Sequence, residues 1–166
     1  MDRLDQIEDV DVQFVTSARA LHLAATLSES LCDEIASRFS FEAVSSCHFD
    51  IKIKVISKEC WELRGKIIAD ITQSCIATGE PVKELIDASI EERFVPTVDE
   101  HDEIDVTDSS VEALQEGKIP LAEVLMQTVG LAANPYPRVE NAPDNFEFGP
   151  KIEKENPFSK LIHLKK

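Results

Sequence analysis

The chain has few of the residues that mark low-complexity or membrane-spanning sequences. It contains 5 glycines and 8 prolines among 166 residues, and 43% of its residues are hydrophobic, which is the composition of a folded domain rather than of a disordered chain. No apolar run approaches the roughly 20 residues that a membrane-spanning helix needs. The start, Met1-Asp2-Arg3, has no apolar stretch after a basic one. We therefore expect no secretory signal and a cytoplasmic protein.

Local signatures of catalysis and of metal binding are also missing. The sequence has no G-x-S-x-G, no H-E-x-x-H and no glycine-rich phosphate loop, and its 4 histidines are scattered. The four cysteines lie 15, 13 and 15 residues apart, which fits neither a zinc finger nor a dense disulfide framework. We interpret them as buried, reduced thiols. The sequence thus predicts a non-enzymatic protein with no metal and no cofactor.

Basic residues are scarce relative to acidic ones, and they are unevenly placed. The net charge is -15, which divides into -18 over residues 1–150 and +3 over residues 151–166. A surface of this charge repels a phosphate backbone, so a basic protein is the better partner.

The acidic excess is densest in residues 99–108, which carry six carboxylates and no lysine or arginine. Self-repulsion predicts an exposed loop here. The stretch lacks the central glycine and the terminal glutamate of an EF-hand loop, so we expect no calcium site. The partner-binding candidates in this loop are Asp99, Glu100, Asp102, Glu103 and Asp105.

Apolar and polar residues alternate in three stretches, over residues 49–56, 61–71 and 86–94, which predicts an antiparallel meander. Gly65 lies inside the second stretch, where we expect the strand to be bent or bulged and where the missing side chain permits a close backbone approach. A further short strand is expected over residues 10–14. Helical periodicity predicts one helix over residues 28–39, capped by Ser28. It predicts another with its apolar face between Leu121 and Val129, with Pro120 in its first turn, and Asn134, Pro135 and Pro137 end this helix.

The expected fold is therefore α+β: an antiparallel meander, either open or curled into a partly closed barrel, flanked by two helices. We expect one domain over residues 1–139 and an extended tail over residues 140–166, with a short amphipathic basic end that Asn156-Pro157 opens as a helix cap. The tail either docks on its own sheet or binds a partner. Its candidate residues are Asn156, Pro157, Phe158, Lys160, Leu161, Lys165 and Lys166.

Three segments, in this order, resemble the YceD-like family of large-subunit ribosomal RNA accumulation proteins. They are residues 63–82, which end in Cys75-Ile76-Ala77-Thr78-Gly79-Glu80-Pro81-Val82; residues 117–137, which end in Asn134-Pro135-Tyr136-Pro137; and Asn156-Pro157-Phe158-Ser159-Lys160-Leu161 with Leu164-Lys165-Lys166. The family has a C-x-x-C-x-x-P turn, whereas here Thr78 replaces the second cysteine. A metal role for that pair therefore does not carry over, and we interpret Cys75, Gly79 and Pro81 as a structural turn.

The resemblance implies a role in the accumulation or maturation of large-subunit ribosomal RNA, in a bacterium or an organelle of bacterial origin. We expect an accessory factor whose acidic body binds a basic ribosomal protein or a pre-ribosomal large-subunit particle, with no membrane and no small-molecule substrate. Two alternatives stay open. The tail lysines could contact RNA directly, or the protein is an adaptor unrelated to ribosomes that a partner recognises through the Asn-Pro-Phe segment.

Overall fold

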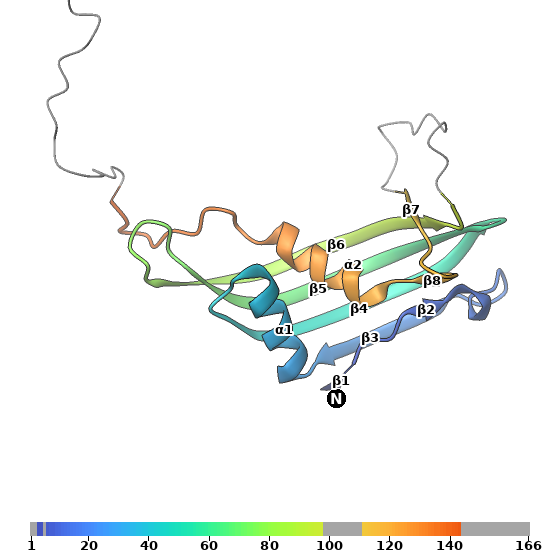
Figure 1. Ribbon diagram of the computed structural model, residues 1–166, viewed down its shortest axis with the longest axis horizontal. Helices are drawn as coiled ribbons and strands as arrows, with labels where there is room; N and C mark the ends of the chain where they lie inside the picture. Colours follow the sequence, from blue (N-terminus) through green and yellow to red (C-terminus); the bar gives the residue numbers. More distant parts are fainter. Residues whose placement is uncertain (1–2, 5, 98–110, 144–166) are drawn as a thin grey trace, which may run out of the picture.

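The computed structural model describes residues 3–4, 6–97 and 111–143, and it shows an α+β fold with two helices on one face of a sheet (Figure 1). The sheet has six strands in the order β1-β3-β4-β5-β6-β7. Its strands are β1 (Arg3–Leu4), β3 (Leu21–Leu27), β4 (Ala43–Ser57), β5 (Cys60–Ser74), β6 (Pro81–Val95) and β7 (Val111–Ala113). The strands β2 (Val10–Asp11) and β8 (Lys118–Ile119) form a separate pair, and the helices are α1 (Glu29–Phe39) and α2 (Leu121–Ala132).

The predicted meander is confirmed: β4, β5 and β6 are 15 residues each and pair antiparallel in sequence order. Their alternating apolar residues face the helices and form the core, where Phe49, Ile53, Leu63 and Ile67 are buried. The strands extend beyond the predicted stretches. At their ends the backbone pairs with the neighbouring strand, but apolar and polar side chains do not alternate there. Backbone pairing of this kind leaves no periodic signal in the sequence.

Gly65 lies in regular register opposite Ile51 on β4 and Ile90 on β6, so the expected bulge there is wrong. The expected close approach is confirmed, because a Cβ at this position would lie 2.2 Å from the carbonyl oxygen of Asp50 and 2.6 Å from Cα of Ile51. The irregularities of the β4–β5 ladder fall instead near its two ends, at Val44/Ser46 and Val55/Ser57. Gly65 thus lets two central strands approach closely without breaking their pairing.

The sheet is open rather than closed into a barrel. In the described part of the chain its edges are β1 and β7, which pair in parallel with β3 and β6 over two and three residues and do not pair with each other. The strand expected over residues 10–14 is shorter than predicted, since a 3-10 helix follows at Val12–Phe14. The side chain of Asp11 accepts a hydrogen bond from the backbone of Gln13 (3.0 Å), and this local bond turns the chain out of the strand.

Both predicted helices are confirmed, and each buries one apolar face on the sheet. In α1 the cap is Ser28, whose hydroxyl accepts a hydrogen bond from the backbone of Leu31 (3.5 Å). α2 follows Pro120 and ends at Ala132, shortly before Asn134, where the sequence places the end of this helix. No helix among the described residues is long and apolar enough to cross a membrane.

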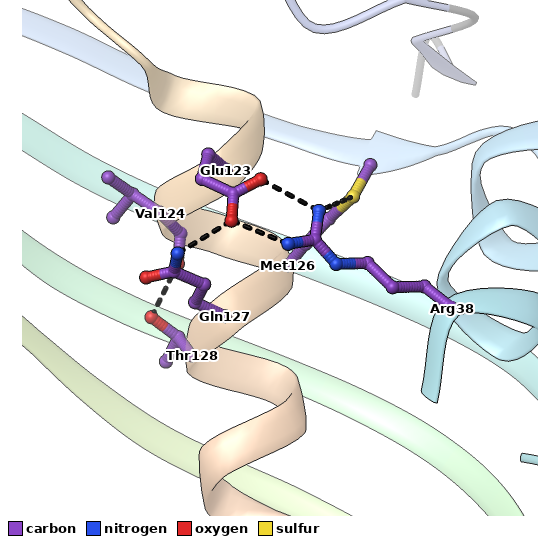
Figure 2. A network of polar contacts seen from close by, with 6 residues as sticks. All are labelled: Arg38, Glu123, Val124, Met126, Gln127 and Thr128. Atoms are coloured by element: carbon purple, nitrogen blue, oxygen red, sulfur yellow. Dashed lines mark hydrogen bonds and ion pairs between the residues drawn. The ribbon is translucent and has the colours of Figure 1, made fainter. Parts of the chain in front are cut away.

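The two helices also contact each other on the face of the sheet that they share. Arg38 of α1 donates two hydrogen bonds to the carboxylate of Glu123 on α2 (2.7 and 2.6 Å), and Gln127 donates a third (2.6 Å) (Figure 2). One turn further, a Cβ at Gly130 would lie 2.3 Å from the ring of Phe39. The missing side chain of Gly130 therefore allows α2 to pack closely against the end of α1.

Candidate functional site

A cleft lies between the N-terminal segment (residues 6–14) and strand β3. Its volume is about 830 Å³, within the range of roughly 300–1,000 Å³ that is usual for ligand pockets. Its apolar lining comes from the N-terminal segment, from β3, and from one residue each of β4 and α2. The apolar lining residues are Ile7, Val10, Phe14, Leu21, Leu23, Ala24, Ala25, Phe49 and Leu121.

The cleft exists because the N-terminal segment is fastened to β8 and not to β3. Val10 pairs with Ile119, and the backbone of Val12 donates to the carbonyl of Gly117 (3.3 Å). In the described part of the chain β1 meets β3 only at Thr26 and Leu27. Leu21 and Leu23 face the core side but are only half-buried. Residues 6–11 therefore pass alongside β3 without closing against it.

The rim of the cleft is acidic. Glu8 and Asp9 are exposed at its edge and Asp11 is half-exposed beside them, whereas Lys118 is the one lysine or arginine among the described residues that line it. The whole chain carries a net charge of -15, which adds a long-range negative potential to this local one. An apolar floor under an acidic rim suits a ligand that is apolar and positively charged.

The predicted structural turn, with Cys75, Gly79 and Pro81, lies between β5 and β6. The backbone of Cys75 donates to the carbonyl of Glu80 (2.8 Å), and that of Gly79 donates to the carbonyl of Cys75 (2.9 Å). Gly79 has φ +75°, the left-handed region that favours glycine. Pro81 begins β6. These bonds give the turn a fixed conformation, as the sequence predicted.

Cys75 is 3% exposed, and its sulfur lies near the backbone of this turn. The Thr78 hydroxyl, with help from the backbone N–H groups of Val139 and Ala77, holds the pKa of Cys75 at about 7, below its ordinary value. The backbone of Ala77 lies within hydrogen-bond distance of the sulfur (3.4 Å). Thr78, which stands in place of a second cysteine, thus lowers the pKa of the first. In the described part of the chain there is no group of three or more histidine, cysteine and carboxylate side chains that could hold a metal.

Two of the three segments that carry the family resemblance meet at this turn. The backbone of Ile76 donates to the carbonyl of Pro137 (2.9 Å), and the side chain of Gln73 donates to the carbonyl of Asn134 (3.1 Å). Glu84 of β6 accepts a hydrogen bond from the backbone of Asn134 (3.0 Å). The turn and the end of α2 therefore form one unit, although they are about 60 residues apart in the sequence.

The second face of the sheet has no described helix over it and carries ion pairs between neighbouring strands. His22 lies 2.6 Å from Asp50, and Lys66 lies 3.3 Å from Asp87. Glu62 is buried between Lys54 (2.7 Å) and Arg64 of its own strand. The hydrogen bond from the Lys54 ammonium is the main reason that the pKa of Glu62 lies below its ordinary value. Because opposite charges alternate across this face, it offers no large patch of one sign.

The remaining candidates from the sequence lie outside the described residues. These are the acidic group Asp99, Glu100, Asp102, Glu103 and Asp105, and the tail group Asn156, Pro157, Phe158, Lys160, Leu161, Lys165 and Lys166. The four cysteines form no disulfide; Cys32, Cys47 and Cys75 are buried and Cys60 is half-buried. Burial raises the pKa of Cys47 to about 12.

Comparison with known proteins adds no relative at this point: no family model, no curated protein and no solved structure matches the chain. The class of protein that the fold and the site define is an α+β protein with an acidic, apolar-floored cleft at one edge of an open sheet.

The cleft was not predicted from the sequence because β3 was not predicted. The signal was present, since Leu21, Leu23, Ala25 and Leu27 alternate with His22, Ala24 and Thr26. The run is short, and two of its members are alanines, which are depleted in strands. The cleft itself depends on the path of residues 6–11, which has no local sequence signal.

Proposed function

We propose that the protein is a non-enzymatic accessory factor in large-subunit ribosomal RNA accumulation, and that it acts in the cytoplasm by binding a basic ribosomal protein or a pre-ribosomal particle. The observation that carries the proposal is the cleft of about 830 Å³ between residues 6–14 and β3, with its apolar floor and acidic rim. A segment of a basic protein that carries both basic and apolar side chains would fit both properties of the cleft.

The resemblance to the YceD-like family supports the ribosomal context. The turn at Cys75 and the end of α2, which belong to two of the resembling segments, are hydrogen-bonded to each other. Interacting segments are expected when a sequence pattern reflects a shared fold rather than chance matches in separate places. The charge of the chain supports the mode of action, because a net charge of -15 speeds association with a basic partner.

The test is copurification of the tagged protein with large-subunit precursors from growing cells. The cleft variant Glu8→Lys with Asp9→Lys reverses two exposed charges at the rim, and we expect it to lower the recovery of precursors at least fivefold. The matched control is Asp33→Lys with Glu34→Lys, which makes the same change of charge on the exposed face of α1. The proposal fails if the two variants recover precursors equally well.

A further inference from the structure

The cleft reaches the backbone edge of β3 and not merely one face of the strand. Successive side chains of a strand point to opposite faces of a sheet, yet the consecutive residues Leu23, Ala24 and Ala25 all line the cleft. On the opposite side the lining residues are also consecutive, from Gln6 to Asp11. A cavity bounded in this way by two stretches of chain has the shape of a slot for a third.

Within residues 3–4, 6–97 and 111–143, the edge of β3 that faces this slot has no pairing partner over most of its length. β3 pairs with β4 from Leu21 to Thr26, whereas on its other side β1 meets it at Thr26 and Leu27. Among the described residues no backbone hydrogen bond joins residues 6–11 to residues 21–25. Unpaired N–H and C=O groups on an edge strand are a template for a further strand, and residues 21–25 contain none of the lysines or prolines that usually prevent this.

We propose that the cleft takes an extended segment of a basic protein, which adds to the edge of β3 as a new strand. This inference rests on the proposed function and names how the partner of that same cleft is bound. Backbone hydrogen bonds to β3 hold the segment in register. Alternate side chains of the segment then fill the apolar floor at Leu21 and Leu23, and basic side chains reach the carboxylates of Glu8 and Asp9.

The probe is an eight-residue capped peptide of alternating lysine and valine, titrated against the full-length protein by fluorescence anisotropy. The matched peptide has glutamate in place of every lysine. We expect the lysine peptide to bind at least tenfold more tightly than the glutamate peptide at low salt. The variant Glu8→Lys with Asp9→Lys is expected to lose at least tenfold in affinity for the lysine peptide, and Asp33→Lys with Glu34→Lys less than twofold.

Backbone methylation tests strand addition itself. On one edge of a strand only every second N–H group faces the neighbouring strand. N-methylation of one alternate set of peptide residues should therefore lower the affinity at least tenfold, and methylation of the other set less than twofold. Equal effects of the two sets would overturn strand addition, because binding would then depend on side chains alone. Dissociation of a dimer of this protein by the peptide would overturn it too, by showing a second copy to be the occupant.

Failure of this inference is distinguishable from failure of the proposed function. If the peptide does not bind, but the rim variant still recovers fewer large-subunit precursors than the control variant, strand addition is wrong and the proposed function stands. The opposite result is also possible: the peptide binds, the two N-methylated sets differ in affinity as expected, and the rim and control variants recover precursors equally. In that case the edge of β3 binds basic strands and the ribosomal role is wrong.

Discussion

The central meander and the N-terminal edge of the same sheet differ in how completely their backbones are paired. β5 is paired along nearly its whole length with β4 on one side and β6 on the other. At the N-terminal edge, β1 and β2 are two residues each, and residues 21–25 of β3 lack a neighbour on their outer side in the described part. The difference teaches where stability and binding are located. The meander supplies the rigid scaffold, and the underpaired edge offers the backbone groups that a partner needs.

Hydrogen exchange measures this difference directly, and it should show the largest effect. We expect the central amides of β4, β5 and β6 to exchange through global unfolding, which costs about 5–15 kcal/mol in domains of this kind. Amides of residues 6–11 are expected to exchange through local opening that costs several kcal/mol less. Similar protection in the two regions would remove the distinction on which the comparison is based.

The next largest effect is expected from Gly65→Ala in the meander. The new methyl group would meet the backbone of Asp50 and Ile51, at 2.2 and 2.6 Å, so the two strands must separate. We expect a loss of about 3 kcal/mol or more in the free energy of unfolding, measured by urea denaturation. Gly79→Ala is the control, because it also adds a methyl group but nothing lies within 4 Å; its left-handed φ should cost about 1 kcal/mol. Equal losses in both variants would contradict the close approach at Gly65.

A smaller, pH-dependent effect is expected at Glu92, on the side of the meander opposite the cleft. Burial, with the nearby charge of Glu112, raises the pKa of Glu92 to about 6 from its ordinary 4.5. Because the folded protein binds this proton more tightly than the unfolded chain, the stabilisation is fully present below pH 4.5 and is lost as the pH rises through 6.

Glu92→Gln should therefore raise the free energy of unfolding above pH 7, by at most about 2 kcal/mol, and the gain should vanish below pH 4.5. Thermal denaturation at several pH values measures it. Glu112→Gln, which removes the secondary cause, is expected to give a smaller gain of the same sign. A gain that is independent of pH would contradict this account of Glu92.

The smallest effect is expected where the two helices meet. Arg38 and Glu123 are partly exposed, with side-chain exposures of 42% and 36%, so solvent screens their attraction. A double-mutant cycle with Arg38→Ala and Glu123→Ala should give a coupling free energy below about 1 kcal/mol. A coupling of several kcal/mol would mean that the helical layer depends on this ion pair rather than on packing against the sheet.

The parts of the fold that could be predicted are those with a long periodic pattern. Alternation from Phe49 to Ile53 and from Leu63 to Ile71 located the meander, and Ser28 and Pro120 located the helix starts. The short strands at the edges could not be predicted, because two or three residues carry no period and their pairing depends on distant partners. Asp11 shows the opposite case, in which a single side-chain hydrogen bond ends a strand that alternation alone would continue.

For the candidate site, the basic partner stays a prediction, and the place of the cleft was not predicted. The acidic excess of the sequence predicts a basic partner, and the rim residues Glu8 and Asp9 are acidic. The cleft requires residues 6–11 to lie beside β3, a tertiary arrangement with no local signal. The turn at Cys75 was predicted correctly because Gly79 and Pro81 mark turns by their own backbone restrictions.

Site-specific photo-crosslinking in growing cells tests the central claim most directly. A benzoyl-phenylalanine at position 14 places the reactive group at the cleft, where Phe14 is 73% exposed. At position 85 it lies on the face of the sheet opposite α1 and α2, where Leu85 is 68% exposed. We predict that position 14 crosslinks to a basic protein of the large ribosomal subunit and that position 85 does not. Crosslinks to ribosomal proteins from position 85 alone, or to the same proteins from both positions equally, would contradict the claim that the cleft is the binding site.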